Sequence, residues 1–333
     1  MDRNDYIQSS ATVRVLEKKL LDKPFYNRLI ESRDLAEAIR FLQDSYYQTF
    51  VQKLSRPEDY ELALKEAQDA IYKEAYGLSP HKDPVEIAAL IYNYHNLKVL
   101  AKEIILKKTL DSVYVAIGDV NIPKLREAVV DKKPSQDVEK YYEILQDALS
   151  LYEKTKDPQA IDIFMDKKYF ENLKYLARKS EMPMIESYAM NLIDFTNIKT
   201  FLRCKKQERS WEFISKVLIE GGFIEVENFR KYMIEKLDKD SALFKQAEIY
   251  GAVKAGLSSY EDSKSLSLFE QSMDNYFVNM LKEAKKVTYG PEVIFAYVMA
   301  KENEIKNIRI ILMSKLSGLD SEKIRQRLRD SYV

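Results

Sequence analysis

The residue types that most often carry metal or acid–base chemistry are scarce in this chain. It has two histidines, His81 and His95, and one cysteine, Cys204. Neither histidine belongs to an HExxH pair and the cysteine has no CxxC partner, so we predict no metal centre. We interpret His95, which lies in a helical pattern, as a hydrogen-bonded structural group. Basic neighbours of Cys204 would lower its thiol pKa, although a semi-buried structural cysteine is the simpler interpretation.

Motifs for nucleotide or acid catalysis are also missing. The chain contains neither GxxxxGK[ST] nor GxGxxG, the motifs that cradle phosphates. The isolated pair Gly221-Gly222 is interpreted as a turn between helices. Asp162 and Asp166 lie one helical turn apart, as paired catalytic carboxylates could, but we expect them on a solvated helix face. We therefore predict no catalytic residue, no cofactor and no metal.

Six basic residues form the most informative polar pattern. They come as two in each of three segments that resemble one another: Lys98, Lys102, Lys199, Arg203, Lys306 and Arg309. If the three segments are helices around a common axis, these side chains would line a shared cavity. The other interpretation is that they are ordinary charges on outer helix faces. The pattern alone leaves both interpretations open.

The bulk composition limits the class of protein. The 333 residues carry a formal net charge of zero and are 46% hydrophobic, 32% charged and 11% aromatic. This apolar content excludes a disordered chain, and the balanced charge argues against a nucleic-acid binder. A single cysteine favours a reducing compartment, and the first residues have no apolar signal segment. The longest apolar run, Val293–Ala300, is too short to cross a bilayer, which takes about 20 residues.

The elements that must position these residues are predicted to be helices. Glycine and proline are few, at 8 and 9 residues, and a 3.6-residue apolar period recurs along the chain. Proline is tolerated in the first turn of a helix, where its missing N–H would have no partner. Three long helices are therefore expected to begin at Asp83-Pro84, Met182-Pro183 and Gly290-Pro291. The predicted fold is all-α.

Two landmarks recur along these segments. In each long helix an asparagine is followed six residues later by a basic residue: Asn96 and Lys102, Asn197 and Arg203, Asn303 and Arg309. Each helix is then followed by a glycine, which we interpret as a helix end: Gly118, Gly222 and Gly318. A register that instead matches Asn197–Lys199 with Glu304–Lys306 would shift the third helix by one residue.

The recurrence predicts an internal triplication with a period of about 100 residues, too long for a solenoid repeat. We expect three similar helical lobes around a pseudo-threefold axis. Their approximate ranges are 1–112, 113–215 and 216–333. The charged start of AKENEIKNIRIILMSKLSGL (Ala300–Leu319) is then interpreted as a polar approach to a central cavity, followed by an apolar anchor.

Segments at the end, at the start and in the middle of the chain resemble a known family. The segment Gly290–Val333, with AYVMAKENEIKNIRIIL and its GL.....IR.RL tail, resembles the end of the C subunits of V-type/A-type rotary ATPases, which are equivalent to the d subunit of the eukaryotic V-ATPase. Ala11–Tyr47 and NYHNLKVLAK (Asn93–Lys102) also look like that family. The resemblance covers essentially the whole chain, although Lys102 stands where an arginine was expected.

The resemblance implies a fold and a role. Members are all-α, with three similar lobes arranged as a funnel. One face sits on the membrane rotor ring of proteolipid subunits, and the opposite opening receives the central shaft, made of D-type and F-type subunits. The chain would then be a non-catalytic central-stalk subunit that transmits torque between ATP hydrolysis or synthesis and proton or sodium transport. It would lie peripherally on the cytoplasmic face of the cell membrane, with no transmembrane segment.

Two other classes of function share parts of this pattern. A helical scaffold or adaptor unrelated to rotary ATPases would have the same composition and the same lack of catalytic motifs. It would not need the ordered C-terminal pattern. An enzyme would need a cluster of perturbed acids, bases or ligands that the two histidines and one cysteine hardly provide. The six basic residues remain the candidate shaft, ring or funnel-lining positions.

Overall fold

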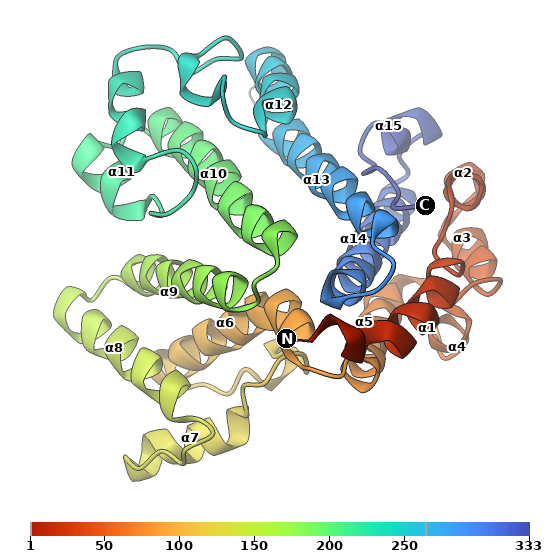
Figure 1. Ribbon diagram of the computed structural model, residues 1–333, viewed down its shortest axis with the longest axis horizontal. Helices are drawn as coiled ribbons and strands as arrows, with labels where there is room; N and C mark the ends of the chain where they lie inside the picture. The colour runs from red at the N-terminus through yellow and green to blue at the C-terminus, as the bar shows by residue number, and fades with distance from the viewer. Residues whose placement is uncertain (1, 264) are drawn as a thin grey trace. The chain divides into compact units, whose positions relative to one another are not determined.

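The computed structural model describes residues 2–263 and 265–333, and in these ranges the chain is helical with no β-strand. The predicted all-α class is confirmed (Figure 1). The α-helices are α1 (Ile7–Glu17), α2 (Lys23–Glu31), α3 (Leu35–Leu42), α4 (Gln48–Val51), α5 (Tyr60–Leu78), α6 (Asp83–Leu106), α7 (Ile122–Asp131), α8 (Glu139–Thr155), α9 (Pro158–Lys179), α10 (Pro183–Lys206), α11 (Trp211–Val217), α12 (Tyr250–Ser263), α13 (Ser267–Leu281), α14 (Pro291–Leu316) and α15 (Ser321–Arg325).

Short 3₁₀ helices connect some of these elements: η1 (Arg3–Tyr6), η2 (Pro57–Asp59), η3 (Asp111–Val113), η4 (Val226–Met233), η5 (Ala242–Phe244) and η6 (Lys282–Lys286). Local chemistry explains where many helices begin. The Asp34 carboxylate accepts a hydrogen bond from the Glu37 N–H at the start of α3, and Asp157 caps α9 in a similar way ahead of Pro158. The three long helices α6, α10 and α14 begin at Asp83, Pro183 and Pro291, as predicted from the prolines.

The chain forms two compact units. One comprises Met1–Val85 with Met190–Val333, and the other is Glu86–Ala189. In the second unit, α8 packs against α9, and α7 packs against α8. The unit boundaries fall inside α6 and α10, whereas the lobe boundaries predicted from sequence fall elsewhere. The division into three lobes stays a prediction.

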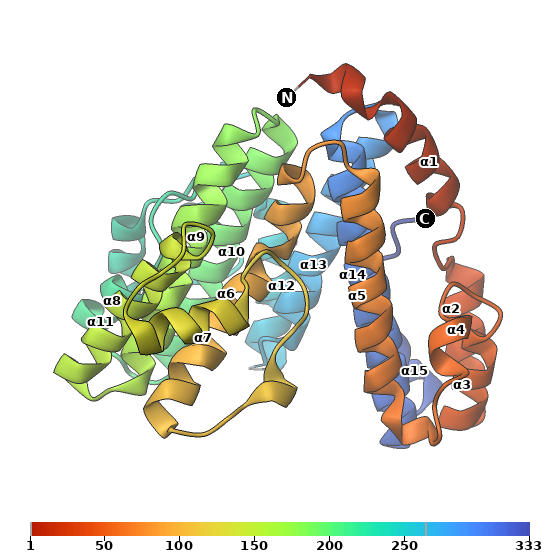
Figure 2. The same cartoon turned by 90° about the horizontal axis from the view of Figure 1, so that it is seen from below.

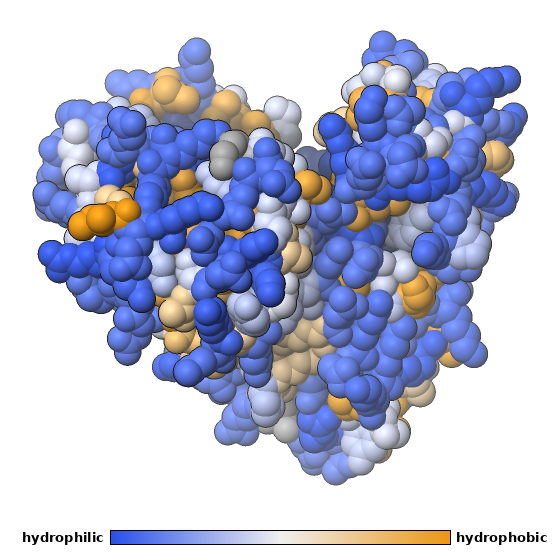
Figure 3. All heavy atoms as spheres, turned by 90° about the horizontal axis from the view of Figure 1, so that it is seen from above, coloured by the Kyte–Doolittle hydropathy of each residue, from blue (hydrophilic) through white to orange (hydrophobic). Residues whose placement is uncertain are grey.

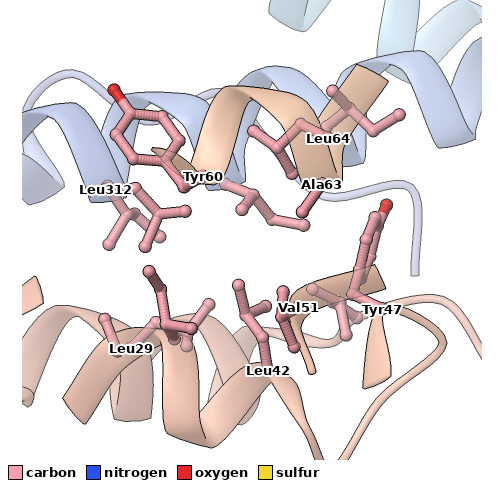
Figure 4. Packing of buried hydrophobic residues seen from close by; sticks show 14 of the residues in the cluster. Leu29, Leu42, Tyr47, Val51, Tyr60, Ala63, Leu64 and Leu312 are labelled. Atoms are coloured by element: carbon pink, nitrogen blue, oxygen red, sulfur yellow. The ribbon is translucent and has the colours of Figure 1, made fainter. Parts of the chain in front are cut away.

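One apolar core cluster of the first unit combines residues from an early part of the chain, 21–71, with residues from a late part, 305–324. Helix α14 packs against α5, and the two run side by side in Figure 2. Helices α2, α3 and α4 close the cluster from the opposite side, so Leu29 and Leu42 face Tyr60, Leu64 and Leu312 (Figure 4). The buried positions of α3, from Leu35 to Leu42, follow the i, i+3, i+4, i+7 spacing of an amphipathic helix.

One face of the molecule is drawn with its hydropathy in Figure 3. On the face drawn in Figure 3, hydrophilic residues cover most of the surface and apolar residues form small separate patches. Among the described residues, no helix is both long and apolar enough to pass through a membrane.

Candidate functional site

An asparagine side chain in each long helix binds the backbone of a segment that follows it. Asn96 of α6 donates from Nδ2 to the Val115 carbonyl at 2.8 Å and accepts from the Val115 N–H at 3.0 Å. Asn197 of α10 makes the same two bonds with Ile219, at 2.7 and 2.8 Å. An amide side chain can complete such a two-bond pair because it has both a donor and an acceptor.

The third member of this set is Asn307 of α14. Its Nδ2 donates to the Arg329 carbonyl at 3.1 Å and its Oδ1 accepts from the Arg329 N–H at 2.9 Å. Asn303 makes a single bond to the Asp330 carbonyl. By these contacts Asn307, and not Asn303, is equivalent to Asn96 and Asn197. The predicted alignment of the third helix through Asn303 is therefore wrong by four residues, about one helical turn. The sequence could not separate the two residues because both are asparagines on the same helix.

The residue three positions before each of these asparagines also accepts backbone N–H groups. Asn93 accepts from Asp119, Asp194 accepts from Phe223 and Ile224, and Glu304 accepts from Leu21. The polar pair on each helix is thus a repeated feature that the sequence analysis did not identify. The sequence did hold a signal for this pair: each long helix has two polar residues three positions apart, whether they are Asn, Asp or Glu. All six of these polar residues are buried.

Two of the three predicted landmark glycines serve this contact. A Cβ on Gly118 would collide with Oδ1 of Asn93, and a Cβ on Gly222 would collide with Oδ1 of Asp194. Gly118 also adopts a φ of 101°, which disfavours other residues. Gly318 has open space around its Cα and follows α14 with a φ of 68°. Only Gly318 acts as the predicted helix end, because the other two allow close approach of a loop to a long helix.

Asp194 is a buried carboxylate that no cation compensates among the described residues. Its two oxygens accept the Phe223 and Ile224 N–H groups, both at 3.1 Å. Burial raises the pKa of Asp194 from 3.8 to about 6, because desolvation outweighs the two hydrogen bonds. The folded chain therefore holds this proton at pH values where the unfolded chain has lost it.

This pKa shift predicts a pH dependence of stability. Between pH values of about 4 and 6 the unfolded chain binds fewer protons than the folded chain, so stability falls as the pH rises. A rise of about two pKa units corresponds to a loss of about 3 kcal/mol across this window. Urea unfolding of the wild type and of Asp194→Asn at several pH values measures the effect. The wild type should lose this amount relative to the variant as the pH rises, and parallel profiles would contradict the assignment.

Five of the six candidate basic residues form ion pairs within their own unit. In the second unit, Lys98 binds Asp166 at 2.5 Å and Lys102 binds Asp162 at 3.1 Å, which joins α6 to α9. Asp162 and Asp166, which we expected on a solvated helix face, are partly exposed and form ion pairs with these lysines. Arg203, on an exposed part of α10, has no ion pair with any residue in the described ranges.

The remaining three candidates lie in the first unit. Lys199 binds Glu270 at 3.3 Å and Lys306 binds Asp274 at 2.9 Å, both carboxylates of α13. The guanidinium Nε of Arg309 lies 3.0 Å from both oxygens of Glu61 in α5. Lys98, Lys199 and Arg309 each stand two residues after a backbone-binding asparagine, and each ties its long helix to another helix.

Two of the charges that open the stretch Ala300–Leu319, in the middle of α14, are buried inside the fold. Lys301 is 0% exposed and Glu304 is 2% exposed, and Lys301 Nζ lies 2.7 Å from Glu304 Oε1. Glu304 also accepts from the Tyr47 hydroxyl at 2.8 Å and from the Leu21 N–H at 2.5 Å. The Lys301 ammonium lies 4.2 Å from the Tyr46 ring centroid. These charges form a buried polar cluster, so the interpretation from sequence is wrong for this pair.

A segment without regular structure, residues 328–333, crosses α13 and α14, and we call it the C-terminal strap. Besides the Asn307 contact, Arg329 Nε binds Asp274 at 2.8 Å and the Asp330 N–H donates to Asn275 at 2.8 Å. The Tyr332 hydroxyl donates to Glu17 of α1 at 3.0 Å. The strap thus fastens three helices of the first unit to one another.

The other chemistry-bearing residues have structural surroundings. His95 Nε2 lies 3.0 Å from the Val113 carbonyl, so the predicted hydrogen bond is present. Cys204 is buried, and burial raises its thiol pKa, which is the opposite of an activated thiol. No group of three or more His, Cys, Asp or Glu side chains placed to hold a metal occurs in residues 2–263 and 265–333.

Comparison with known proteins identifies a family along nearly the whole chain. The family of ATP synthase (C/AC39) subunits matches residues 9–327. The C subunit of the A-type ATP synthase of Methanocaldococcus jannaschii is 27% identical, with 98% of this chain and 87% of the relative covered. The C subunit of the V-type sodium ATPase of Enterococcus hirae is 23% identical, with 98% and 99% covered. The corresponding A-type protein of Methanosphaera stadtmanae is 28% identical, with 98% and 89% covered. The chain therefore belongs to the family of ATP synthase (C/AC39) subunits.

Proposed function

We propose that this chain is the non-catalytic central-stalk subunit of a V-type/A-type rotary ATPase. In this role it joins the membrane rotor ring to the central shaft and transmits torque between ATP chemistry and proton or sodium transport. The observation that carries the proposal is the match along 98% of the chain to relatives named as the C subunits of an A-type ATP synthase and of a V-type sodium ATPase. The comparisons support this family and not an unrelated helical scaffold.

The internal contacts suit a part that transmits force. The three long helices have 24, 24 and 26 residues, and each is tied to other segments by a buried asparagine and by an ion pair. Backbone hydrogen bonds from Asn96, Asn197 and Asn307 fix loops to helices without depending on long flexible side chains. Elements with buried and fully bonded groups resist local opening, which keeps the helices in fixed register.

Membership of the family supports a proposal about partners. We propose that the D-type and F-type shaft subunits and the proteolipid ring contact this chain, which lies peripherally on the cytoplasmic face of the membrane. Of the six candidate residues, Arg203 is the one whose charge no carboxylate of the described chain compensates. Lys102, Lys306 and Arg309 are partly exposed and already ion-paired. An acidic surface of the shaft would have to displace a carboxylate to bind Lys102, Lys306 or Arg309. It could bind Arg203 without displacing an ion pair of the described chain.

Reconstitution tests the proposed function. With head, shaft and membrane ring present, ATP hydrolysis should drive ion transport only after this chain is added. Uncoupled hydrolysis that persists after its addition, or coupling without it, would contradict the proposal. The readout is ion uptake per ATP hydrolysed in vesicles.

Charge reversal tests the candidate contact. Arg203→Glu should slow association with the isolated shaft at low salt and lose this effect at high salt, because exposed charges act mainly on orientation and on-rate. Lys216→Glu is the matched control, since Lys216 is 69% exposed and pairs with Glu212 on its own helix. Equal association rates of both variants and the wild type at low salt would remove Arg203 from the interface.

A further inference from the structure

The C-terminal strap borders a hollow in the first unit that the proposed function does not use. Its volume is about 430 Å³, within the range of small-molecule pockets. Helix α2, the start of η6, α15 and the strap supply the wall: Lys23, Tyr26, Asn27, Ile30, Lys282, Arg325, Leu328, Arg329, Asp330 and Ser331. We propose that this pocket binds a phosphorylated small molecule.

The first argument is charge. Four of the ten lining residues are basic and one is acidic. Arg325 pairs with Glu31, and Arg329 pairs with Asp274, so their charges are largely compensated. Lys23 and Lys282 form no ion pair with any described residue. The Asp330 carboxylate has no ion pair with a described residue either and offsets one of these charges, so the two lysines leave the pocket with a net positive charge. Lys23 and Lys282 belong to segments far apart in the sequence.

The fixed arginine adds a directed donor. Arg329 is held by the backbone pair with Asn307, by its Nε bond to Asp274 and by its Nη1 bond to the Arg327 carbonyl at 2.6 Å. Its Nη2 has no bond to a described residue, so this pocket-lining guanidinium keeps one donor group unused within the fold. A guanidinium held in place loses little conformational freedom on binding, which favours phosphate recognition.

The second argument is the mixed character of the wall. Tyr26, Ile30 and Leu328 give it an apolar part, while Asn27 and Ser331 offer neutral hydrogen-bonding groups. Inorganic phosphate would use only the lysines and the arginine. A phosphorylated organic molecule would use both parts, with its phosphates toward Lys23 and Lys282 and its organic portion against Tyr26 and Leu328. The ligand class is therefore an organic di- or triphosphate free in solution.

Titration calorimetry of the full chain tests the pocket. The probes are ATP and pyrophosphate, each with EDTA to exclude metal bridging, and vesicles with and without phosphatidylglycerol. We expect ATP to bind more tightly than pyrophosphate, and the joint variant Lys23→Glu with Lys282→Glu to weaken ATP binding by at least about tenfold, or 1.4 kcal/mol. Lys133→Glu is the control, because Lys133 is an exposed lysine of the other unit with no ion pair among the described residues.

Three results would overturn the proposal. One is the absence of ATP binding at millimolar concentration by the wild type. Another is equal binding by the wild type and the joint lysine variant. The third is lysine-dependent binding to phosphatidylglycerol vesicles without binding of either free phosphate compound, which would make the pocket a lipid headgroup site. Lys282→Met is a milder variant that removes one charge without reversing it. The thermal unfolding midpoint of each variant is measured as well, and an unchanged midpoint shows that a loss of binding does not come from a loss of fold.

Discussion

Replacing Lys301 by methionine should lower the free energy of unfolding by about 3–5 kcal/mol, because the Glu304 carboxylate then stays buried without its cation. The side chains of both residues are almost fully removed from solvent, and Glu304 keeps only its bonds to Tyr47 and Leu21. Urea unfolding of the purified chain, followed by circular dichroism, measures the loss.

The same helix supplies the control for this prediction. Lys306 also pairs with a carboxylate, but its side chain is 47% exposed, so Lys306→Met should cost less than about 1 kcal/mol. Combining Lys301→Met with Glu304→Gln should recover part of the loss, since the amide can still accept the Leu21 N–H without a buried charge. If Lys301→Met and Lys306→Met lower the free energy of unfolding by the same amount, the prediction that the buried ion pair contributes more than the exposed one is wrong.

Removing the buried asparagines should produce the second largest loss. Asn197→Ala leaves both the N–H and the carbonyl of Ile219 without partners, and each orphaned buried group costs about 1–3 kcal/mol. Asn307→Ala should act in the same way on Arg329. The midpoint of urea unfolding should fall for both variants.

Asn303→Ala separates the two registers of the third long helix. Asn303 makes one bond, in an exposed setting, to the Asp330 carbonyl, so its removal should cost less than about 1 kcal/mol. If Asn303→Ala proves as costly as Asn197→Ala while Asn307→Ala is mild, the equivalence of Asn96, Asn197 and Asn307 is wrong.

The helices and their starting points could be predicted from sequence because the signals are local. Prolines and capping residues act within one turn, and the apolar period acts within one helix, so α6, α10 and α14 begin where Pro84, Pro183 and Pro291 indicate. The same reasoning failed for Gly118 and Gly222. Their role depends on Asn93 and Asp194, side chains of other elements that approach their Cα atoms.

The surroundings of the charged residues could not be predicted for a related reason. The partners of Lys98, Lys199 and Arg309 lie far along the chain, at Asp166, Glu270 and Glu61. Burial of Lys301 depends on Tyr46 and Tyr47, about 250 residues earlier in the sequence. A charged residue in a helix looks the same in sequence whether it meets solvent or a distant tyrosine.

The packing of α14 against α5 also has a consequence for synthesis of the protein. About 210 residues separate the end of α5 from the start of α14, and the ribosome adds about 5–20 residues each second. The apolar sides of α3 and α5 therefore remain uncovered for roughly 10–40 seconds after they leave the ribosome. The first helices to be made are among the last to complete their core, and until then their uncovered apolar sides can associate with other chains.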